Sequence, residues 1–316
     1  MTPTVSVLVT SYNRERFIGA SIESVLAQTF ADFELLVIDD CSTDGTLDVA
    51  RGYERLDPRI RVVVNERNLG QFGNRNRAAE LARAPLFKYH DSDDVMYRHC
   101  LAAMVPPMQA SPEAAIGLST GSCWYGGPCP MLLTPRMAYQ REFLGAGLFN
   151  PGPGGAVLRA DAFRALGGWN DRGAPSDYLF WLRACARVSV LLLPADLFWY
   201  RVHAGQELNS ARAARQYAET IRDTWAALAA DTCPLEPEER IRARRNVLAS
   251  QVKLLWRDLR AGAFALARAR VAAGPTALEW LRYLGPPSRD AAAGTPPLDE
   301  RARTASVPAT EGALRS

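Results

Sequence analysis

The sequence predicts an α/β fold with a mostly parallel sheet, helices on both faces and a helical extension at the C-terminal end. Over roughly the first ninety residues, short apolar runs alternate with segments of helical apolar spacing, and repeated βαβ units of this kind build parallel sheets. Acidic and other polar residues follow directly on the apolar runs, which is where α/β sheets bind ligands. Beyond Ser210 nearly every segment has helical spacing.

The first part of the chain contains four expected strands separated by three expected helices. The strands are apolar runs, rich in β-branched and aromatic residues, at positions 5–9, 33–38, 61–64 and 86–90. Helical spacing covers residues 17–26 and 74–82. Between them, the turn at residues 42–46 can cap a helix that runs to about Arg55.

After about Ala115 the pattern is less regular. We expect helices at residues 160–166 and 176–187, a strand at 188–193, and loops in the Pro- and Gly-rich segments before them. Residues 210 to about 284 are expected to be helical, with breaks at Cys233-Pro234 and Gly274-Pro275. Residues 286–316 are rich in Pro, Ala, Ser, Thr and charge, so we expect them to be disordered.

The composition is typical of a globular protein with a large core, at 316 residues and 48% hydrophobic content. A formal net charge of +3 gives no argument for a nucleic-acid partner, and we expect none. The six cysteines form no CxxC pair, so we expect reduced thiols and a cytoplasmic protein. The first strand begins at Val5 and leaves no room for a signal peptide, and no stretch approaches the ~18–20 apolar residues of a membrane span.

The acidic segment Asp91-Ser92-Asp93-Asp94 follows the fourth expected strand directly. Carboxylates that are close together raise one another's pKa unless a positive charge lies among them. A hard divalent cation, Mg²⁺ or Mn²⁺, is the natural counter-charge, and such ions also hold substrate phosphates. The alternative is a solvated turn in which Ser92 or Asp94 caps a helix that starts near Val95.

Polar residues at other strand ends are further candidates. Thr10 and Tyr12 offer a hydroxyl and an aromatic face for a nucleoside base. Asp39 and Asp40 can accept hydrogen bonds from a base or a ribose, and Arg75, near a helix start, can pair with a diphosphate. Each of these segments taken alone is equally consistent with ordinary loop and capping residues.

Two candidates lie in the second half of the chain. Asp177 falls in the first turn of an otherwise apolar helix, where it can act as a general base or simply complement the helix dipole. His203 is one of three histidines, and a lone histidine after a strand is more often a packed or surface residue than a metal ligand. No nucleophile elbow is present, so covalent acyl chemistry has no support.

In their order and spacing these segments closely resemble the nucleotide-sugar-dependent family-2 glycosyltransferases of the GT-A fold. The resemblance covers about residues 4 to 205 and is most specific over the first hundred. The segments that carry it are Val5–Arg14, Glu23–Phe30, Val37–Thr46, Asn68–Gly70, Arg75–Asn76, Asp91–Asp94, Gly167–Trp169 and Ser176–Arg183.

The resemblance implies a donor site at the strand ends. Thr10, Tyr12, Asp39 and Asp40 would hold the nucleoside of a nucleoside-diphosphate sugar, and Arg75 would approach the donor.

It also implies where the metal and the base would be. Asp93 would contact the divalent cation and the diphosphate, with Asp91 behind it. His203 matches a late histidine that reaches the metal or the diphosphate in related enzymes, and Asp177 matches the catalytic base.

The expected architecture is a GT-A domain built on a Rossmann-like sheet. Residues 1–100 would form its nucleotide-sugar-binding half, 101–209 its acceptor-binding half, 210–285 the helical extension and 286–316 the tail.

Three departures from the family pattern stand out. Ser176 replaces an acidic residue found in many members, and Cys41 replaces a frequent glycine. The loops between Tyr125 and Gly155 match no family element, so the acceptor stays open.

The primary hypothesis is an inverting, metal-dependent sugar transfer by single displacement, in glycan, polysaccharide or glycoconjugate biosynthesis. Asp177 would take the proton from an acceptor hydroxyl, and the metal at Asp93 would neutralise the departing nucleoside diphosphate. The acceptor is a glycan, a lipid-linked compound or a small molecule. The alternatives are a sugar-phosphate nucleotidyltransferase, for which a glycine-rich loop after the first strand is missing, and a catalytically silent nucleotide-sugar-binding protein.

The helical extension offers two interpretations. Arginines surround Leu254-Leu255-Trp256, so the extension could rest peripherally on the inner face of an anionic membrane. More often such a helix packs its apolar stripe on the catalytic domain and leaves its arginines in solvent, and this is the interpretation that we favour.

Overall fold

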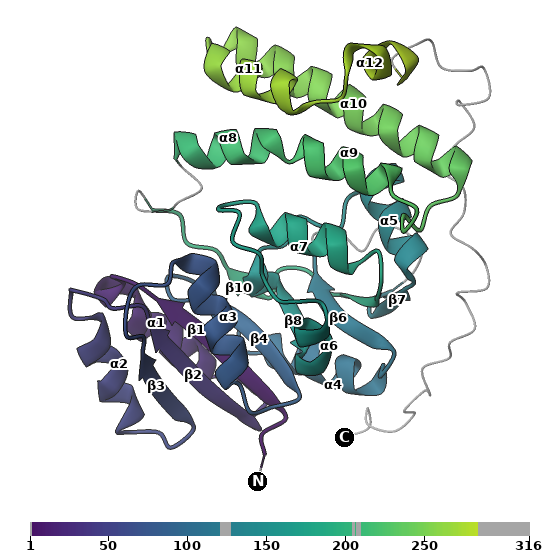
Figure 1. The fold of residues 1–316 in the computed structure, drawn as a ribbon. Coiled ribbons are helices and arrows are strands. Elements are labelled where there is room, and N and C mark those ends of the chain that lie inside the picture. The colour runs from purple at the N-terminus through teal and green to yellow at the C-terminus, as the bar shows by residue number, and fades with distance from the viewer. Residues whose placement is uncertain (1, 121–127, 204–205, 207–209, 284–316) are drawn as a thin grey trace.

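The computed structural model describes residues 2–120, 128–203, 206 and 210–283. Its centre is an eight-stranded sheet with the strand order β3-β2-β1-β4-β8-β6-β9-β7, and a small second sheet pairs β10 with β5 (Figure 1). The strands are β1 (Val5–Ser11), β2 (Phe33–Asp39), β3 (Ile60–Val64), β4 (Leu86–Asp91), β5 (Val95–Met96), β6 (Ala114–Ser119), β7 (Met131–Leu133), β8 (Ala156–Arg159), β9 (Ser189–Leu193) and β10 (Phe198–Trp199).

The helices fall into those that cover the sheet and those that follow it. The first group is α1 (Glu15–Leu26), α2 (Thr46–Glu54), α3 (Gln71–Leu81), α4 (Cys100–Ala110), α5 (Pro135–Leu144), α6 (Ala160–Ala165) and α7 (Ser176–Ala184). The second group is α8 (Ala211–Glu219), α9 (Ile221–Ala229), α10 (Pro237–Arg260), α11 (Phe264–Ala273) and α12 (Ala277–Tyr283).

The predicted α/β fold with a mostly parallel sheet is confirmed. Strands β1 to β4 pair in parallel, as do β6 and β9, whereas β8 and β7 run antiparallel to their neighbours. Val7 and Val9 point to a core shared with α1, α2 and α4, and Leu8 between them points to a core shared with α3, α5, α6 and α7. Successive residues of a strand face opposite sides, so the uninterrupted apolar runs follow from helices lying on both faces.

The expected elements of the first ninety residues are all present, with shifted ends. Strands β1, β2 and β4 continue into the polar residues Ser11, Asp39 and Asp91, because parallel pairing depends on backbone groups and not on apolar side chains. Helix α3 begins at Gln71, three residues before its expected start at Asn74.

The predicted helix near Val95 is wrong. Val95 and Met96 form β5, which pairs antiparallel with Trp199 and Phe198 of β10, and α4 begins only at Cys100. This pairing partner is about a hundred residues away in the sequence, so a local pattern cannot reveal it.

The irregular middle of the chain is more ordered than its sequence indicates. Strands β6, β7 and β8 and helix α5 lie between Ala114 and Arg159. Helix α5 has a strong N-terminal signal inside this Pro-rich segment. Its N-cap Thr134 accepts a hydrogen bond from the Met137 N–H, and Pro135 occupies the first helical position. The expectation of reduced thiols is wrong at Cys129, which is disulfide-bonded.

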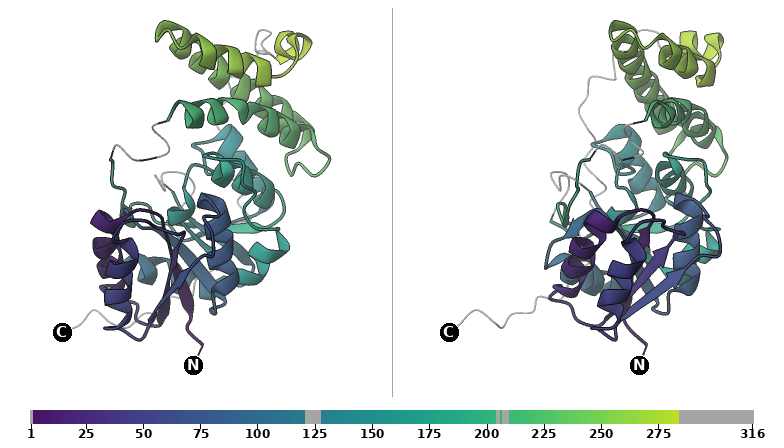
Figure 2. Two further views of the ribbon diagram at one scale, coloured as in Figure 1. Left: turned by 60° about the vertical axis from the view of Figure 1, so that its left-hand side comes forward. Right: turned by 90° about the vertical axis from the view of Figure 1, so that its left-hand side faces the viewer.

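The helical extension lies beyond the sheet, as the upper part of Figure 1 and both views of Figure 2 show. The two expected breaks are present, and further breaks occur at Thr220 and at residues 261–263. Helix α10 contacts α5 of the sheet domain as well as α9, α11 and α12. Among the helices of the described ranges, none combines the length and apolar character needed to cross a bilayer. The tail at 286–316, expected to be disordered, lies outside the described residues.

Cys41 occupies a backbone conformation that explains why glycine suits this position. Its φ of 64° lies in the left-handed region, which costs a side-chain-bearing residue of this kind about 1 kcal/mol. The Cys41 Sγ donates to the Asn65 carbonyl oxygen at 3.0 Å, so the thiol keeps a partner in this turn.

Candidate active site

The register of the parallel strands brings the polar strand ends together. Ser11 of β1 lies opposite Asp39 of β2, and Thr10 lies opposite Asp91 of β4. Because these strands run in the same direction, their carboxyl ends meet at one edge of the sheet. The candidates at the ends of three separate strands therefore form one site, at the position where α/β sheets bind ligands.

Asp39 and Asp40 are buried and hold two loops in place. Asp39 accepts hydrogen bonds from the backbone N–H and the hydroxyl of Ser42, which orders the turn before α2. Asp40 accepts from the backbone N–H groups of Leu69 at 2.8 Å and Gly70 at 3.0 Å. The pair thus fixes the shape of the edge, and its role toward a nucleoside stays a prediction.

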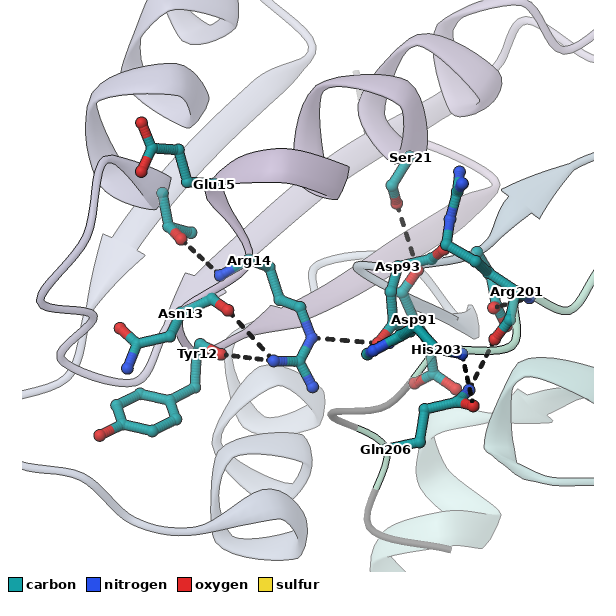
Figure 3. Close-up of polar contacts among 12 residues, drawn as sticks. Tyr12, Asn13, Arg14, Glu15, Ser21, Asp91, Asp93, Arg201, His203 and Gln206 are labelled. Atoms are coloured by element: carbon teal, nitrogen blue, oxygen red, sulfur yellow. Dashed lines mark hydrogen bonds and ion pairs between the residues drawn. The ribbon is translucent and has the colours of Figure 1, made fainter. Parts of the chain in front are cut away.

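Tyr12 gives this edge an aromatic surface, since 46% of the residue is exposed. Its ring points away from the carboxylates in Figure 3. Asn13, at φ 52°, turns the chain after β1, and its side-chain oxygen accepts from the Thr43 N–H at 2.8 Å. Thr10 is half-buried one residue before the end of β1. Thr10 and Tyr12, the two predicted nucleoside contacts, therefore both lie at the sheet edge, and Tyr12 is open to solvent there.

Asp93 is the centre of a small polar cluster (Figure 3). Its Oδ2 lies 3.0 Å from Arg14 Nε and 3.0 Å from His203 Nε2. The Asp93 backbone carbonyl accepts from Arg201 Nε at 2.7 Å. The structure thus brings Asp93 together with His203, 110 residues later, and adds Arg14 and Arg201, which the sequence reasoning did not assign. The metal role of Asp93 and His203 stays a prediction.

Asp91 and Arg75 form the second charged pair. Arg75 is buried, and its Nη2 donates to Asp91 Oδ1 at 2.6 Å. Burial by itself would raise the pKa of Asp91, but the Arg75 guanidinium and its hydrogen bond outweigh burial and hold that pKa below its usual range. Asp91 is therefore ionised, and Arg75 sets its orientation.

Asp94 has a different environment from its neighbours. Its Oδ1 accepts from the Arg201 backbone N–H at 2.9 Å, which replaces the predicted helix cap. Burial, reinforced by the charges of Asp91 and Asp93, raises the pKa of Asp94 to about 7. Burial is the largest cause of this shift, so the raised pKa shows above all that Asp94 is poorly solvated at the end of β4.

The donor set suits a divalent cation of the magnesium or manganese type. Among the described residues, no three His, Cys, Asp or Glu side chains are grouped so as to hold a metal ion by themselves. Ions of this type are commonly held by one or two carboxylates together with substrate phosphates. The carboxylate of Asp93 and the adjacent imidazole of His203 fit such a shared site, and the ionised Asp91 lies two residues before Asp93.

Asp177 lies in the first turn of α7, as predicted. Its Oδ1 accepts from the Tyr178 backbone N–H at 2.7 Å. Burial raises the pKa of Asp177 to about 6, although this hydrogen bond and the charge of Arg75 act in the opposite direction. A carboxylate with a pKa near 6 is ionised at neutral pH and is still basic enough to accept a proton efficiently.

A Pro- and Gly-rich loop joins the two carboxylate sites. A Cβ placed on Gly154 would lie 3.8 Å from Asp91 Oδ2, and one placed on Gly152 would lie 3.9 Å from Asp177 Oδ2. Residues 151–155 therefore run from the acidic end of β4 to the first turn of α7. The absence of side chains at these two glycines leaves space beside both carboxylates.

This loop is held by two residues that the sequence reasoning missed. The buried Lys88 of β4 donates to the carbonyl oxygens of Gly154 and, at 3.1 Å, Tyr89. At the other end, Trp181 Nε1 of α7 donates to the Pro151 carbonyl oxygen at 2.8 Å. The sequence could have indicated this role, because Lys88 stands inside an otherwise apolar run. A fully buried lysine requires polar partners, so such a lysine predicts a contact with backbone or side-chain acceptors.

Comparison with known proteins identifies the family. The family model for glycosyl transferase family 2 matches residues 6–167. Over 92 residues the chain is 45% identical to the putative teichuronic acid biosynthesis glycosyltransferase TuaG of Bacillus subtilis, a match that spans 29% of this chain and 36% of that protein.

Solved structures show the same fold at low identity. The S. aureus TarS fragment 1–349, in complex with UDP-GlcNAc, matches with a TM-score of 0.57 and 23% identity over 77% of this chain and 70% of that one. The mannosyltransferase PcManGT of Pyrobaculum calidifontis, in complex with GDP-Man and Mn²⁺, matches with a TM-score of 0.56 and 18% identity over 86% and 84%. Both likenesses bear on the fold alone, and they confirm the GT-A architecture expected from the sequence.

We predict that Lys88→Met loosens the loop at residues 151–155 without disturbing the sheet. Methionine keeps the length of the side chain but cannot donate to the Gly154 carbonyl, so the loop loses its anchor on β4. Hydrogen exchange should show at least tenfold faster exchange of the Gly155 N–H, which donates to the Gly152 carbonyl oxygen at 2.9 Å. The amides between β1 and β2 serve as the internal control. Unchanged exchange at Gly155 would show that Trp181 alone holds the loop.

Proposed function

Because this chain belongs to glycosyl transferase family 2, we propose that it moves a sugar from a nucleoside-diphosphate donor to an acceptor hydroxyl with inversion at the anomeric carbon. The observation that carries the proposal is the placement of two carboxylate sites at the two ends of one short loop. Asp91 and Asp93 lie at one end, and Asp177 lies at the other. An inverting displacement needs a base on one side of the reacting carbon and charge stabilisation for the leaving group on the opposite side.

The donor is assigned to the edge formed by β1, β2 and β4. Thr10 and Tyr12 are proposed to contact the nucleoside, with Asp39 and Asp40 behind them, and Arg75 to approach the donor. The exposed ring of Tyr12 supports this assignment because an open aromatic face can stack on a base. The nucleotide sugars named for TarS and PcManGT support a nucleoside-diphosphate sugar as the donor class.

The residues proposed to hold a divalent cation are Asp93 and His203, with Asp91 next to them. When bound, such a cation supplies positive charge that stabilises the departing diphosphate. Arg14 contributes from the protein side: it already bonds to Asp93, so it can orient that carboxylate. The Mn²⁺ named for PcManGT supports a metal of this class.

Asp177 is proposed as the catalytic base. Its burial, its fixed hydrogen bond to Tyr178 and its pKa of about 6 are what a base requires to accept a proton at neutral pH. Ser176, which lacks the acidic group of many family members, accepts from the Arg172 N–H and donates to the Gly173 carbonyl. It therefore shapes the turn before Asp177 and adds no charge to it.

The biological setting is proposed from the relatives. The name of TuaG places it in teichuronic acid biosynthesis, which supports polysaccharide biosynthesis as the process for this chain. A nucleotidyltransferase is not favoured, because Arg14 next to β1 is bonded to Asp93 and no glycine-rich loop follows that strand. A silent binding protein is not favoured either, since Asp93 and Asp177 are both present.

A cytoplasmic protein with peripheral membrane contact through the helical extension is a further proposal. Several arginines of α10 have partners inside the protein: Arg240 donates to the Ala230 and Cys233 carbonyls, and Arg244 lies over the Trp225 ring. The last turns of α10 and the start of α11 expose Trp256 and Phe264. Arg257 and Arg260 also lie in the last turns of α10, and Arg257 pairs with Asp258 at 3.2 Å while its side chain stays mostly exposed. Exposed aromatic and basic residues in one place favour an anionic lipid surface.

We predict that Asp177→Asn abolishes transfer and raises stability above pH 6. The pKa of Asp177 is raised on folding, so the ionised group destabilises the fold once the pH exceeds that pKa, and asparagine removes this cost. The melting temperature of Asp177→Asn should therefore exceed the wild-type value at pH 8, and the difference should disappear below about pH 4, where the carboxyl is protonated in both states. Wild-type kcat should fall as the pH drops through about 6.

Asp161 provides the matched control for this experiment. It lies in the first turn of α6 and accepts from the Ala162 N–H at 2.7 Å, as Asp177 does from Tyr178, but it is exposed. Asp161→Asn should leave turnover unchanged. Turnover retained by Asp177→Asn would remove Asp177 from the catalytic role.

We predict that Asp93→Ala weakens metal-dependent diphosphate binding by at least tenfold. The substitution removes the Asp93 carboxylate from the proposed cation site. The His203 imidazole and the diphosphate that remain would not hold the cation as tightly without it. Thermal-shift titrations with UDP and GDP, with Mn²⁺ and with EDTA, measure the effect. The exposed Asp48 of α2 provides the control as Asp48→Ala. Equal Mn²⁺ dependence in Asp93→Ala and wild type would exclude Asp93 as a ligand.

We predict that the full chain co-sediments with vesicles containing phosphatidylglycerol at low salt and not with phosphatidylcholine vesicles. The double variant Trp256→Ser, Phe264→Ser should lose this binding, because it removes the exposed aromatic side chains that would enter the interface. The control is Leu278→Ser on α12, which removes an equally exposed apolar residue elsewhere. No binding of the wild type at low salt would end the membrane proposal.

A further inference from the structure

A cavity of about 690 Å³ lies between the sheet domain and the helical extension. Its walls come from α5 and the loop after it, the first turn of α7, and the facing sides of α8, α9 and α10. Figure 1 shows α7, α9 and α10 as successive layers above the sheet. The volume is within the range of ~300–1,000 Å³ that is usual for ligand sites.

The cavity includes the proposed catalytic base in its wall. Asp177 lines it, together with the adjacent Tyr178. Asp177 is also the residue beside Gly152 at one end of the loop that leads to Asp91. Asp177 thus borders both the cavity and the loop that leads to the donor edge, so a molecule in the cavity has access to the proposed base.

The lining combines aromatic surface with neutral polar groups. Phe149, Tyr178 and Tyr217 supply rings, and two of these rings are fixed: Tyr178 shares a 2.7 Å hydrogen bond with Thr224, and Tyr217 donates to the Ala174 carbonyl at 3.1 Å. Asn150, Asn246, Ser250 and Gln251 supply amides and a hydroxyl.

The charges in the lining are few. Among the residues that the structure describes, Lys253 is the one cation in the lining, and Glu142 accepts from the Leu148 and Phe149 N–H groups. A nucleotide or a polyphosphate would require several cations. A carbohydrate instead presents apolar C–H faces to aromatic rings and hydroxyl groups to neutral donors and acceptors, which is the chemistry of this lining.

We infer that this cavity is the acceptor site and that the acceptor is a carbohydrate. A sugar in the cavity presents a hydroxyl to Asp177, and the side chains of α8, α9 and α10 select which sugar enters. The helical extension is then a specificity element of the enzyme and not only a packing layer. The inference rests on the proposed function for the role of Asp177, while the cavity and its ligand class can be tested by binding alone.

The test fills the cavity from α10. Ser250 is exposed and lines the cavity, so Ser250→Trp places a large ring where the acceptor would lie. Arg242→Trp makes the same addition at an exposed position of the same helix that does not line the cavity. A milder variant, Ser250→Leu, covers the case in which Ser250→Trp does not fold, and binding of UDP reports folding in each protein.

The probe is a panel of p-nitrophenyl hexosides and N-acetylhexosaminides, titrated in the presence of UDP and followed by saturation-transfer NMR. At least one glycoside should bind the wild type and Arg242→Trp with equal affinity and bind Ser250→Trp at least tenfold more weakly. The inference would be overturned if Ser250→Trp and Ser250→Leu both bound the glycosides with wild-type affinity. It would also be overturned if no glycoside bound the wild type. Failure of the proposed function is a separate result: glycosides bind and depend on Ser250, but the wild type neither hydrolyses nor transfers from any nucleotide sugar.

Discussion

The site depends above all on the parallel register of β1, β2 and β4. This pairing aligns Ser11, Asp39 and Asp91 at one edge and thereby concentrates carboxylates where the strands end. Like charges at such distances repel, so the edge needs compensation, which Arg75 and Arg14 supply through short contacts with Asp91 and Asp93. The pKa of Asp94 is raised chiefly by burial, with smaller contributions from the charges of Asp91 and Asp93. In the proposed reaction, a cation bound with the diphosphate would add positive charge beside these carboxylates.

In the proposed reaction, the second half of the chain supplies the base that acts opposite the leaving group. The loop at 151–155 connects the acidic end of β4 to Asp177, and both of its ends are fixed by hydrogen bonds from the sheet and from α7. Lys88 is unusual, since a fully buried ammonium group is costly unless its donors are used. The two carbonyls that it serves make it a positioning residue for the loop. The distance between the base and the acidic site is therefore determined by the core beneath them.

The helical extension adds a layer that the family match at residues 6–167 does not include. It closes a cavity over Asp177, and its far end exposes aromatic and basic residues. These two features divide the extension into a part that faces the proposed acceptor and a part that faces outward. Such a division is consistent with a common donor site and a variable acceptor site, because the donor edge is built from the sheet and the cavity wall from separate helices.

The alternation of apolar runs and helical spacing by itself determined the α/β class, the parallel sheet and the acidic strand ends, since periodicity and strand-end polarity are local properties of the chain. The resemblance of its motifs, in their order and spacing, to the family-2 glycosyltransferases pointed to Asp93, Asp177 and His203 as candidates. Only the tertiary structure decided that Asp93 meets His203 and Arg14, that β5 pairs with β10 where a helix was expected, and that Lys88 and Trp181 hold the loop. Each of these facts joins residues far apart in sequence. Their contacts depend on how strands pair and helices pack, and no local pattern records that.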